Sequence, residues 1–295
     1  MRGIIYAILA TISYSSTPTF TQLGYKGGIQ TDTLLFSRHL VSLVFLIPSI
    51  IKNGSFKTVG RDQIPGLTIL GLFSIFGAVS FNYAYRYLPN MIATAISITY
   101  IVFVFIIEML LGREKYTMRR GVIILLTIIG LVIIALPGSS ISFPMKAFWV
   151  GIGAALLYST QLALINSKKL RQVPSDIIVL TGAIPVMIFS SVRCFIFGVP
   201  LLPSGGLQWF AIICLGTVGV ILARGLFYSS LRLLGATKAS MIDSMEPFTS
   251  AVLGYVFLRQ GISLNMVVGS LLMVISIVLL LREKSPKPQN GPKTL

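Results

Sequence analysis

Long apolar runs determine what this chain can fold into. Runs of about 18 or more mostly apolar residues recur from one end of the sequence to the other, and each is long enough to cross a bilayer as a helix. Hydrophobic residues make up 55% of the 295 residues and charged residues only 11%, whereas a water-soluble domain has about a quarter charged residues. The sequence therefore predicts an all-α membrane protein.

Ten such runs are separated by Gly, Pro and charged residues, which interrupt or end helices. We expect transmembrane helices near 3–23, 31–51, 64–85, 90–111, 121–137, 146–167, 176–198, 206–230, 237–258 and 265–281. The first run lacks a small-residue cleavage site, so it is interpreted as a retained helix rather than a signal peptide.

Basic residues give the expected orientation. The formal net charge is +16, but Lys and Arg lie in short loops between apolar runs, which is typical of membrane topology signals rather than of nucleic-acid binding. With the N-terminus in the cytoplasm, most of the 24 Lys and Arg residues fall on the cytoplasmic side. We therefore expect both termini in the cytoplasm, with a disordered basic tail over 284–295.

The chain also repeats itself weakly. Tyr14 in "TISYSSTPTF" is matched 144 residues later by Tyr158 in "ALLYSTQLAL", and stretches further along align at an offset of 146. The sequence therefore predicts two five-helix repeats, over 1–140 and 145–283.

An odd number of helices in each repeat has a geometric consequence. The second repeat starts on the opposite side of the membrane from the first, so equivalent helices run antiparallel. Inverted repeats of this kind are typical of alternating-access transporters, in which substrate binds near the membrane midplane between the repeats. A duplicated scaffold that transports nothing is the alternative.

Particular residues carry a family resemblance. Lys26 follows the first helix, Arg38 precedes a hydrophobic stretch in the second, and the end of the chain reads "MEPFTSAVLGYVFLRQGISLNMVVGSLLMVISIVLLL". Over essentially its whole length the chain resembles the ten-span EamA-type branch of the drug/metabolite transporter superfamily. The chain departs from the family pattern in having Tyr14 and Tyr158 where members often have Trp. It also has Tyr100 where the first repeat lacks the Glu-Pro pair.

Two carboxylates lie inside the ninth apolar run, in the stretch "MIDSMEPFTS". Ionisable residues in membrane helices are costly and usually face a cavity or a partner. Asp243 and Pro247 share one helical face, and Glu246 borders it. Shifting Asp243 by the repeat offset of 146 gives Ser97, so the fourth and ninth helices carry equivalent polar stripes. We expect both stripes to face the central cavity, with Pro247 as a kink or gating residue.

Glu246 is the leading candidate to bind a substrate cation or a coupling proton, because it lies near the middle of its helix. A structural hydrogen bond to a neighbouring helix is the alternative. Asp243 on the ninth helix and Arg224 on the eighth both lie near the expected cytoplasmic ends of their helices. A salt bridge between them is therefore as reasonable as a binding role for either. Arg38 and His39 on the second helix are expected to reach the depth of Glu246 from the outer side of the membrane.

Polar residues in the first and sixth helices occupy equivalent places. Tyr14, Tyr158 and Gln161 are candidates to line a polar pathway, with Pro18 as a kink in the first helix. Hydrogen bonding between packed helices is an equally good interpretation of these positions. Glu108 is expected to pair near the inner end of its helix, where Arg113 and Lys115 lie, rather than to bind substrate.

The expected function is secondary transport of a small polar or amphipathic metabolite, such as an amino acid or a drug, across the plasma (inner) membrane. The sequence contains no P-loop pattern and no paired His, Cys or Asp with metal-ligand spacing, so we expect no enzyme, cofactor or metal site. A lipid-carrier flippase and a non-transporting membrane scaffold remain the alternatives. Membrane lipid is an expected partner, and a homodimer is left open.

Overall fold

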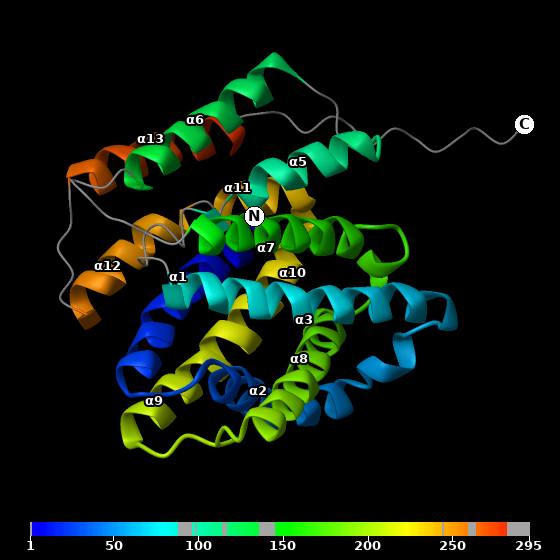
Figure 1. Cartoon of the computed structure of the whole chain (residues 1–295). Coiled ribbons are helices and arrows are strands. Elements are labelled where there is room, and N and C mark those ends of the chain that lie inside the picture. The colour runs from blue at the N-terminus through cyan, green and yellow to red at the C-terminus, as the bar shows by residue number, and fades with distance from the viewer. Residues whose placement is uncertain are drawn as a thin grey trace, which may run out of the picture.

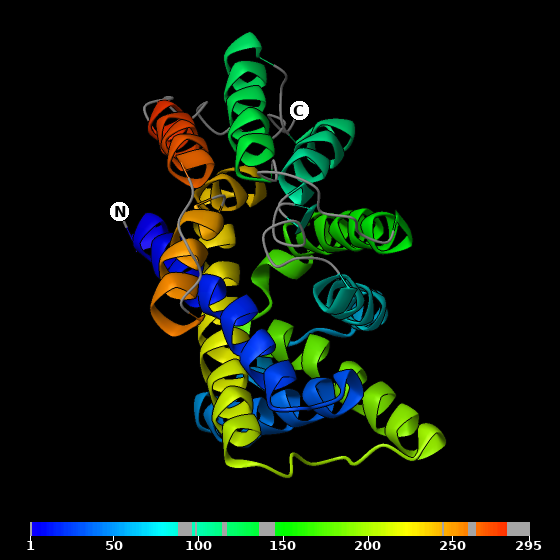
Figure 2. The same cartoon turned by 60° about the vertical axis from the view of Figure 1, so that its left-hand side comes forward.

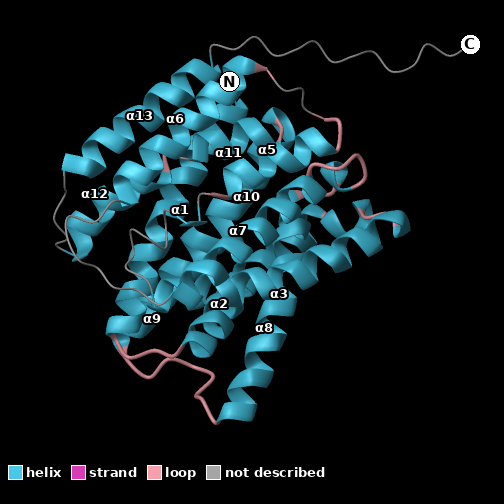
Figure 3. Cartoon of the chain, turned by 45° about the horizontal axis from the view of Figure 1, so that its top comes forward, coloured by secondary structure: helices cyan, strands magenta, loops and turns pink. Residues whose placement is uncertain are grey.

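The computed structural model describes residues 2–87, 96–97, 99–113, 117–135, 145–243, 245–258 and 264–281 (Figure 1). These ranges are almost entirely helical and contain no strand, as Figure 3 shows. The expected all-α class is therefore confirmed for the described part of the chain. The expected disordered tail over 284–295 lies outside the described residues.

Helical segments occupy all ten of the expected ranges within the described residues. In the first half they are α1 (Arg2–Lys26), α2 (Thr31–Asn53), α3 (Ile64–Tyr87), α5 (Tyr100–Leu110) and α6 (Met118–Ala135). In the second half they are α7 (Met145–Ile165), α8 (Ser175–Phe197), α9 (Gly206–Cys214), α10 (Ala223–Leu234), α11 (Ala236–Asp243), α12 (Glu246–Leu258) and α13 (Leu264–Leu281). A π-helical segment, Leu215–Leu222, joins α9 to α10.

Five of these helical stretches are long and apolar enough to cross a membrane by length and composition. They are Thr31–Asn53, Arg61–Tyr87, Met145–Ile165, Ser175–Phe197 and Gly206–Leu234. Large apolar side chains such as Phe45, Phe76 and Phe195 are exposed on their outer faces. A multi-pass membrane protein accounts for this exposure, because lipid rather than water covers such faces.

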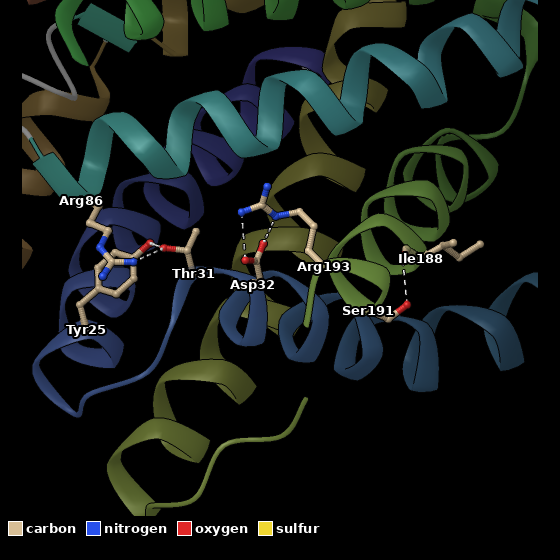
Figure 4. A network of polar contacts seen from close by, with 7 residues as sticks. All are labelled: Tyr25, Thr31, Asp32, Arg86, Ile188, Ser191 and Arg193. Carbon is tan, nitrogen blue, oxygen red and sulfur yellow. Dashed lines mark hydrogen bonds and ion pairs between the residues drawn. The ribbon is translucent and has the colours of Figure 1, made fainter. Parts of the chain in front are cut away.

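α2 and α8 lie side by side and run antiparallel. At one end, Asp32 in the first turn of α2 accepts hydrogen bonds of 2.9 and 3.3 Å from Arg193 near the end of α8 (Figure 4). At the other end, Asp176 in the first turn of α8 accepts a bond of 2.5 Å from Ser55, just beyond α2. Each helix thus offers a first-turn carboxylate to the far end of the other, and the two aspartates are separated by the repeat offset of 144.

The two halves interlock rather than standing apart. α1 of the first half packs on α10 and α12 of the second, and α3 packs on α7 and α8. α6 and α13, the last helices of the two halves, pack against each other at the periphery (Figure 2). The buried hydroxyls of Thr127 and Ser276 are 2.9 Å apart between them.

The ninth expected helix is interrupted. α11 ends at Asp243 and α12 begins at Glu246, with Met245 in a turn between them. Pro247 is the second residue of α12, where a missing backbone N–H costs no intrahelical hydrogen bond. The expected kink at Pro247 therefore takes the form of a helix break before it. Pro18 lies in the interior of α1, which remains helical on both sides of it.

Candidate functional site

A cavity of about 140 Å³ lies between helices of the two halves. Its lining comprises Tyr14, Thr17, Thr21, Arg38, Ser74, Gly77, Ala78, Phe81, Asn82, Tyr85, Ser97, Tyr100, Tyr158, Gln161, Arg224, Tyr228, Asp243 and Glu246. Thr21, Asn82 and Tyr85 lie in the last two turns of α1 and α3, so the cavity extends toward the end of the bundle where those helices finish. By the asymmetry of basic residues, this end is the expected outer side.

The eight residues that the sequence singled out as binding candidates all line this cavity. They are Glu246, Asp243, Arg38, Arg224, Tyr14, Tyr158, Ser97 and Gln161. Three of them come from the first half and five from the second. Two pairs occupy equivalent positions of the repeats, because Tyr14 corresponds to Tyr158 and Ser97 to Asp243. The structure therefore brings the candidates together, and their roles remain proposals.

Asp243 is buried at the end of α11 and is held by hydroxyl groups. Its Oδ2 accepts a hydrogen bond of 2.6 Å from the Tyr100 hydroxyl, and its Oδ1 accepts one of 3.1 Å from Thr11 Oγ1. Thr11 lies on α1 and Tyr100 on α5, so this carboxylate joins α11 to two helices of the first half. Hydrogen bonds to a carboxylate are stronger than those between neutral groups, so Asp243 helps to hold the two halves together.

The salt bridge between Asp243 and Arg224, one of the two alternatives for these residues, is not formed in the described part of the chain. Among the described residues, the ion pairs join Arg113 to Glu108 and Arg193 to Asp32. Asp243 faces hydroxyl groups instead because α11, on which it lies, packs against α1 and α5. The hypothesis of an Asp243–Arg224 lock is therefore wrong for this conformation.

Glu246 begins α12 and faces the cavity. Its backbone carbonyl accepts a hydrogen bond of 3.2 Å from Ser15 Oγ on α1. No described residue donates a hydrogen bond to its side-chain carboxylate. Within the part of the chain that the structure describes, this carboxylate is thus free to meet a solute.

Arg38 on α2 and Arg224 on α10 also face the cavity. Arg38 is only 6% exposed, and its buried Nε lacks a hydrogen-bond acceptor among the described residues. The neighbouring His39 is fully buried, with Nδ1 at 2.7 Å from the Leu35 carbonyl oxygen. His39 is therefore part of the helix packing rather than of the cavity lining.

Aromatic rings form much of the cavity wall. Tyr100 and Tyr158 meet edge to face with centroids 5.0 Å apart, and Phe81 meets Tyr158 at 6.2 Å. Tyr14 packs in the same manner on Phe227 at 5.8 Å. Phe81 and Tyr100 were not among the predicted site residues, although Tyr100 stands one offset of 146 before Glu246. That offset would have identified it.

Several polar residues near the cavity serve to pack helices. Ser15 Oγ lies in a very short contact with Thr249 Oγ1, and Ser250 Oγ donates to the Ser15 carbonyl oxygen at 3.0 Å. These bonds join α1 to α12, as hydroxyl groups often do between membrane helices. Ser15 therefore serves helix contact, while its neighbour Tyr14 lines the cavity.

Glu108 has the structural role expected of it. It is buried on α5, its Oε1 is 3.3 Å from Arg113 Nη1, and its Oε2 accepts a bond of 3.1 Å from Asn166. The described residues contain no group of three or more His, Cys, Asp or Glu that could hold a metal ion. Cys194 and Cys214 are free thiols in the described part of the chain.

Comparisons with known proteins give one consistent family. The profile of the EamA-like transporter family matches residues 1–136 and again 145–282. An "Uncharacterized transporter" of Clostridium kluyveri is 25% identical, with 94% of this chain and 92% of that protein covered. An "S-adenosylmethionine uptake transporter" of Rickettsia felis is 22% identical, with 86% and 84% covered.

Two further similarities agree with these. The "Uncharacterized inner membrane transporter YicL" of Salmonella typhimurium is 23% identical, with 95% of each chain covered. A solved crystal structure has a TM-score of 0.77 at 14% identity, and the match covers 94% of this chain and 96% of that one. That structural likeness shows a shared fold.

Proposed function

The chain belongs to the EamA-like transporter family and is a membrane transporter, and on that premise we propose that it is a secondary active carrier. Its substrate would be a small polar or amphipathic metabolite, an amino acid, a related compound or a drug. Ten transmembrane helices in two inverted repeats would carry this solute across the plasma (inner) membrane by alternating access. Both termini would lie in the cytoplasm.

One observation carries this proposal. Residues from both halves line a single cavity, and that cavity contains two carboxylates and two guanidinium groups among aromatic, hydroxyl and amide side chains. Buried charges are costly unless they have a function or a partner, and Glu246, Arg38 and Arg224 form no ion pair within the described residues. A site for a charged solute between the two halves accounts for that cost.

The antiparallel arrangement of α2 and α8 supports the inverted relation of the repeats. A pseudo-two-fold axis in the membrane plane would relate the two halves and place the substrate near the midplane. In this conformation the cavity extends toward the expected outer side. Transport would require a second conformation in which the same residues open toward the cytoplasm.

The test is transport by the purified protein in liposomes under an imposed pH gradient. A mixed panel of amino acids, organic cations and nucleoside-like metabolites would be followed by mass spectrometry, and S-adenosylmethionine is included because relatives carry that name. Wild type is expected to accumulate at least one member in a pH-dependent manner. Glu246→Gln is expected to lose that pH dependence, with Tyr255→Phe on the exposed face of α12 as the control.

Two results would count against the proposal. Equal, pH-driven uptake by wild type and Glu246→Gln would remove Glu246 from the coupling mechanism. A folded wild-type protein that moves no member of the panel would contradict transport of this class of metabolite.

A further inference from the structure

Arg38 and Arg224 stand out among the charged groups of the cavity. They come from different halves, on α2 and α10, and both line the cavity. Both guanidinium groups therefore place a positive charge in the same enclosed space. Two guanidinium groups held together away from bulk water are unfavourable unless an anion joins them.

No acidic side chain of the described residues provides that anion. Of the two carboxylates in the cavity, Asp243 is bound by Tyr100 and Thr11, and Glu246 forms no ion pair with either arginine. The Nε of Arg38 is buried without an acceptor in the described part of the chain. Positive and negative groups therefore share the cavity without neutralising each other.

The repeat pattern explains how both guanidiniums fit. Gly182 on α8 stands one offset of 144 after Arg38, and Ala78 on α3 stands one offset of 146 before Arg224. A Cβ on Gly182 would lie 3.7 Å from Arg224 Nη1, so that guanidinium lies beside the α8 backbone at this position. Each half thus contributes one arginine, while the equivalent position in the other half is small.

We infer that Arg38 and Arg224 form an anion subsite that binds the carboxylate of a zwitterionic, amino-acid-like substrate. Guanidinium groups match carboxylates because their planar N–H donors can form paired hydrogen bonds. Glu246, which is not paired with either arginine, is positioned to bind the ammonium group of the same solute. The rings of Tyr158 and Phe81 provide an apolar surface for its side chain.

This inference rests on the proposed function, since it names the class of substrate for the same cavity. It excludes simple organic cations as preferred substrates, because they would leave the two arginines without an anion. It also predicts that the carboxyl group dominates recognition.

The experiment is a set of binding titrations on the purified, full-length protein in detergent. The probes are phenylalanine, methionine and S-adenosylmethionine as zwitterions, phenylacetate as an anion, phenylalaninamide and phenethylamine as cations, and inorganic phosphate. Zwitterions are expected to bind at least about tenfold more tightly than the corresponding amide or amine. Phenylacetate is expected to bind more weakly than phenylalanine but to retain its dependence on the arginines.

Variants separate the two ends of the subsite. Arg38→Gln and Arg224→Gln are each expected to weaken phenylalanine binding by about tenfold to hundredfold and to bring the amide-to-acid affinity ratio toward one. Glu246→Gln is expected to weaken phenylalanine while leaving phenylacetate unchanged. Arg86→Gln, which makes the same change of charge at the exposed end of α3, is the matched control and should bind as wild type.

Lysine variants at positions 38 and 224 keep the inference testable if a glutamine variant does not fold. They retain the charge but lose the paired donors, so intermediate affinity is expected. Wild-type affinity for zwitterions in both Arg38→Gln and Arg224→Gln would overturn the inference. Binding of phosphate alone, or of no carboxylate-bearing probe, would overturn it as well.

Comparison with transport separates failure of the subsite from failure of the proposed function. Arginine-dependent binding of zwitterions that are never moved across liposomes would retain the subsite and reject transport. Transport of zwitterions that is unchanged by both arginine variants would retain the carrier and reject the subsite.

Discussion

The hydroxyl of Tyr100 donates a hydrogen bond of 2.6 Å to Oδ2 of Asp243, and this bond connects the two halves of the protein at the cavity. Tyr100 stands one repeat offset of 146 before Glu246, and Asp243 lies three residues before Glu246. Tyr100 and its equivalent in the second repeat, Glu246, thus line the same cavity. The Tyr100–Asp243 bond, which is structural, thus lies beside Glu246, the candidate binding residue.

Removal of the Tyr100 hydroxyl should therefore weaken the contact between the halves. Tyr100→Phe leaves the buried Asp243 carboxylate with the Thr11 bond alone, at an expected cost of about 1–3 kcal/mol. The measurement is thermal unfolding in detergent, followed by intrinsic fluorescence. Tyr255→Phe removes a hydroxyl from an exposed position and should leave the midpoint unchanged; an equal shift in both variants would show that the Asp243 bond contributes nothing specific.

Removal of the Arg224 charge should have the opposite effect on stability from removal of the Tyr100 hydroxyl. Arg224→Gln removes a charge that has no ion-pair partner in the described part of the chain, so the ligand-free protein should be as stable as wild type or more stable. Asp243→Asn should be less stable, because the carboxylate loses its charge-assisted bonds. Unfolding midpoints at pH 7 compare the two variants, and a strongly destabilised Arg224→Gln protein would indicate a structural partner for this side chain.

The ion pairs of Glu108 and Asp32 should differ in importance. Glu108 is buried and bonded to both Arg113 and Asn166, so Glu108→Ala is expected to cost about 3 kcal/mol. Asp32 pairs with Arg193, whose side chain is 38% exposed, so Asp32→Ala should cost only about 0.2–1 kcal/mol. Denaturant titrations of both variants test the ranking, and the reverse order would contradict the burial argument.

The contact between α2 and the π-helical segment depends on a glycine. A Cβ on Gly216 would lie 2.7 Å from the Arg38 carbonyl oxygen and 2.8 Å from Val41 Cβ, so Gly216→Ala must push α2 away. We expect a loss of about 1–3 kcal/mol and weaker substrate binding, because Arg38 moves with its helix. Gly225→Ala on α10 has open space around it and should be neutral or slightly stabilising. Thermal unfolding distinguishes these outcomes.

The sequence predicts the cavity better than it predicts the partners within it. Hydrophobic runs and repeat offsets are properties of the linear chain, so the helices and the clustering of Tyr14, Tyr158 and Glu246 could be predicted from them. The Asp243–Tyr100 bond could not, because it depends on the packing of α11 against α5. The sequence shows only that Asp243 and Arg224 lie near the same end of neighbouring helices, which makes a salt bridge between them a reasonable alternative.

The contacts of Arg224 show a second reason why the partners within the cavity could not be predicted from the sequence. A guanidinium side chain is long and flexible, so helical phase alone does not determine which helix it reaches. It lies beside Gly182, a residue on another helix that has no side chain to mark it. Such contacts follow from tertiary packing and are invisible to periodicity.

The central claim is that solute passes through the cavity between the two halves, and adjacent residues on α3 test it most directly. Tyr85 lines the cavity and Arg86 is exposed beside it. Tyr85→Cys and Arg86→Cys would each be placed in a protein whose two native cysteines are replaced by Ser, treated with a bulky membrane-impermeant thiol reagent, and assayed for uptake in liposomes. The account predicts that labelling at residue 85 abolishes transport while labelling at residue 86 leaves it intact. Full transport by a protein completely labelled at residue 85 would place the pathway elsewhere and contradict the account.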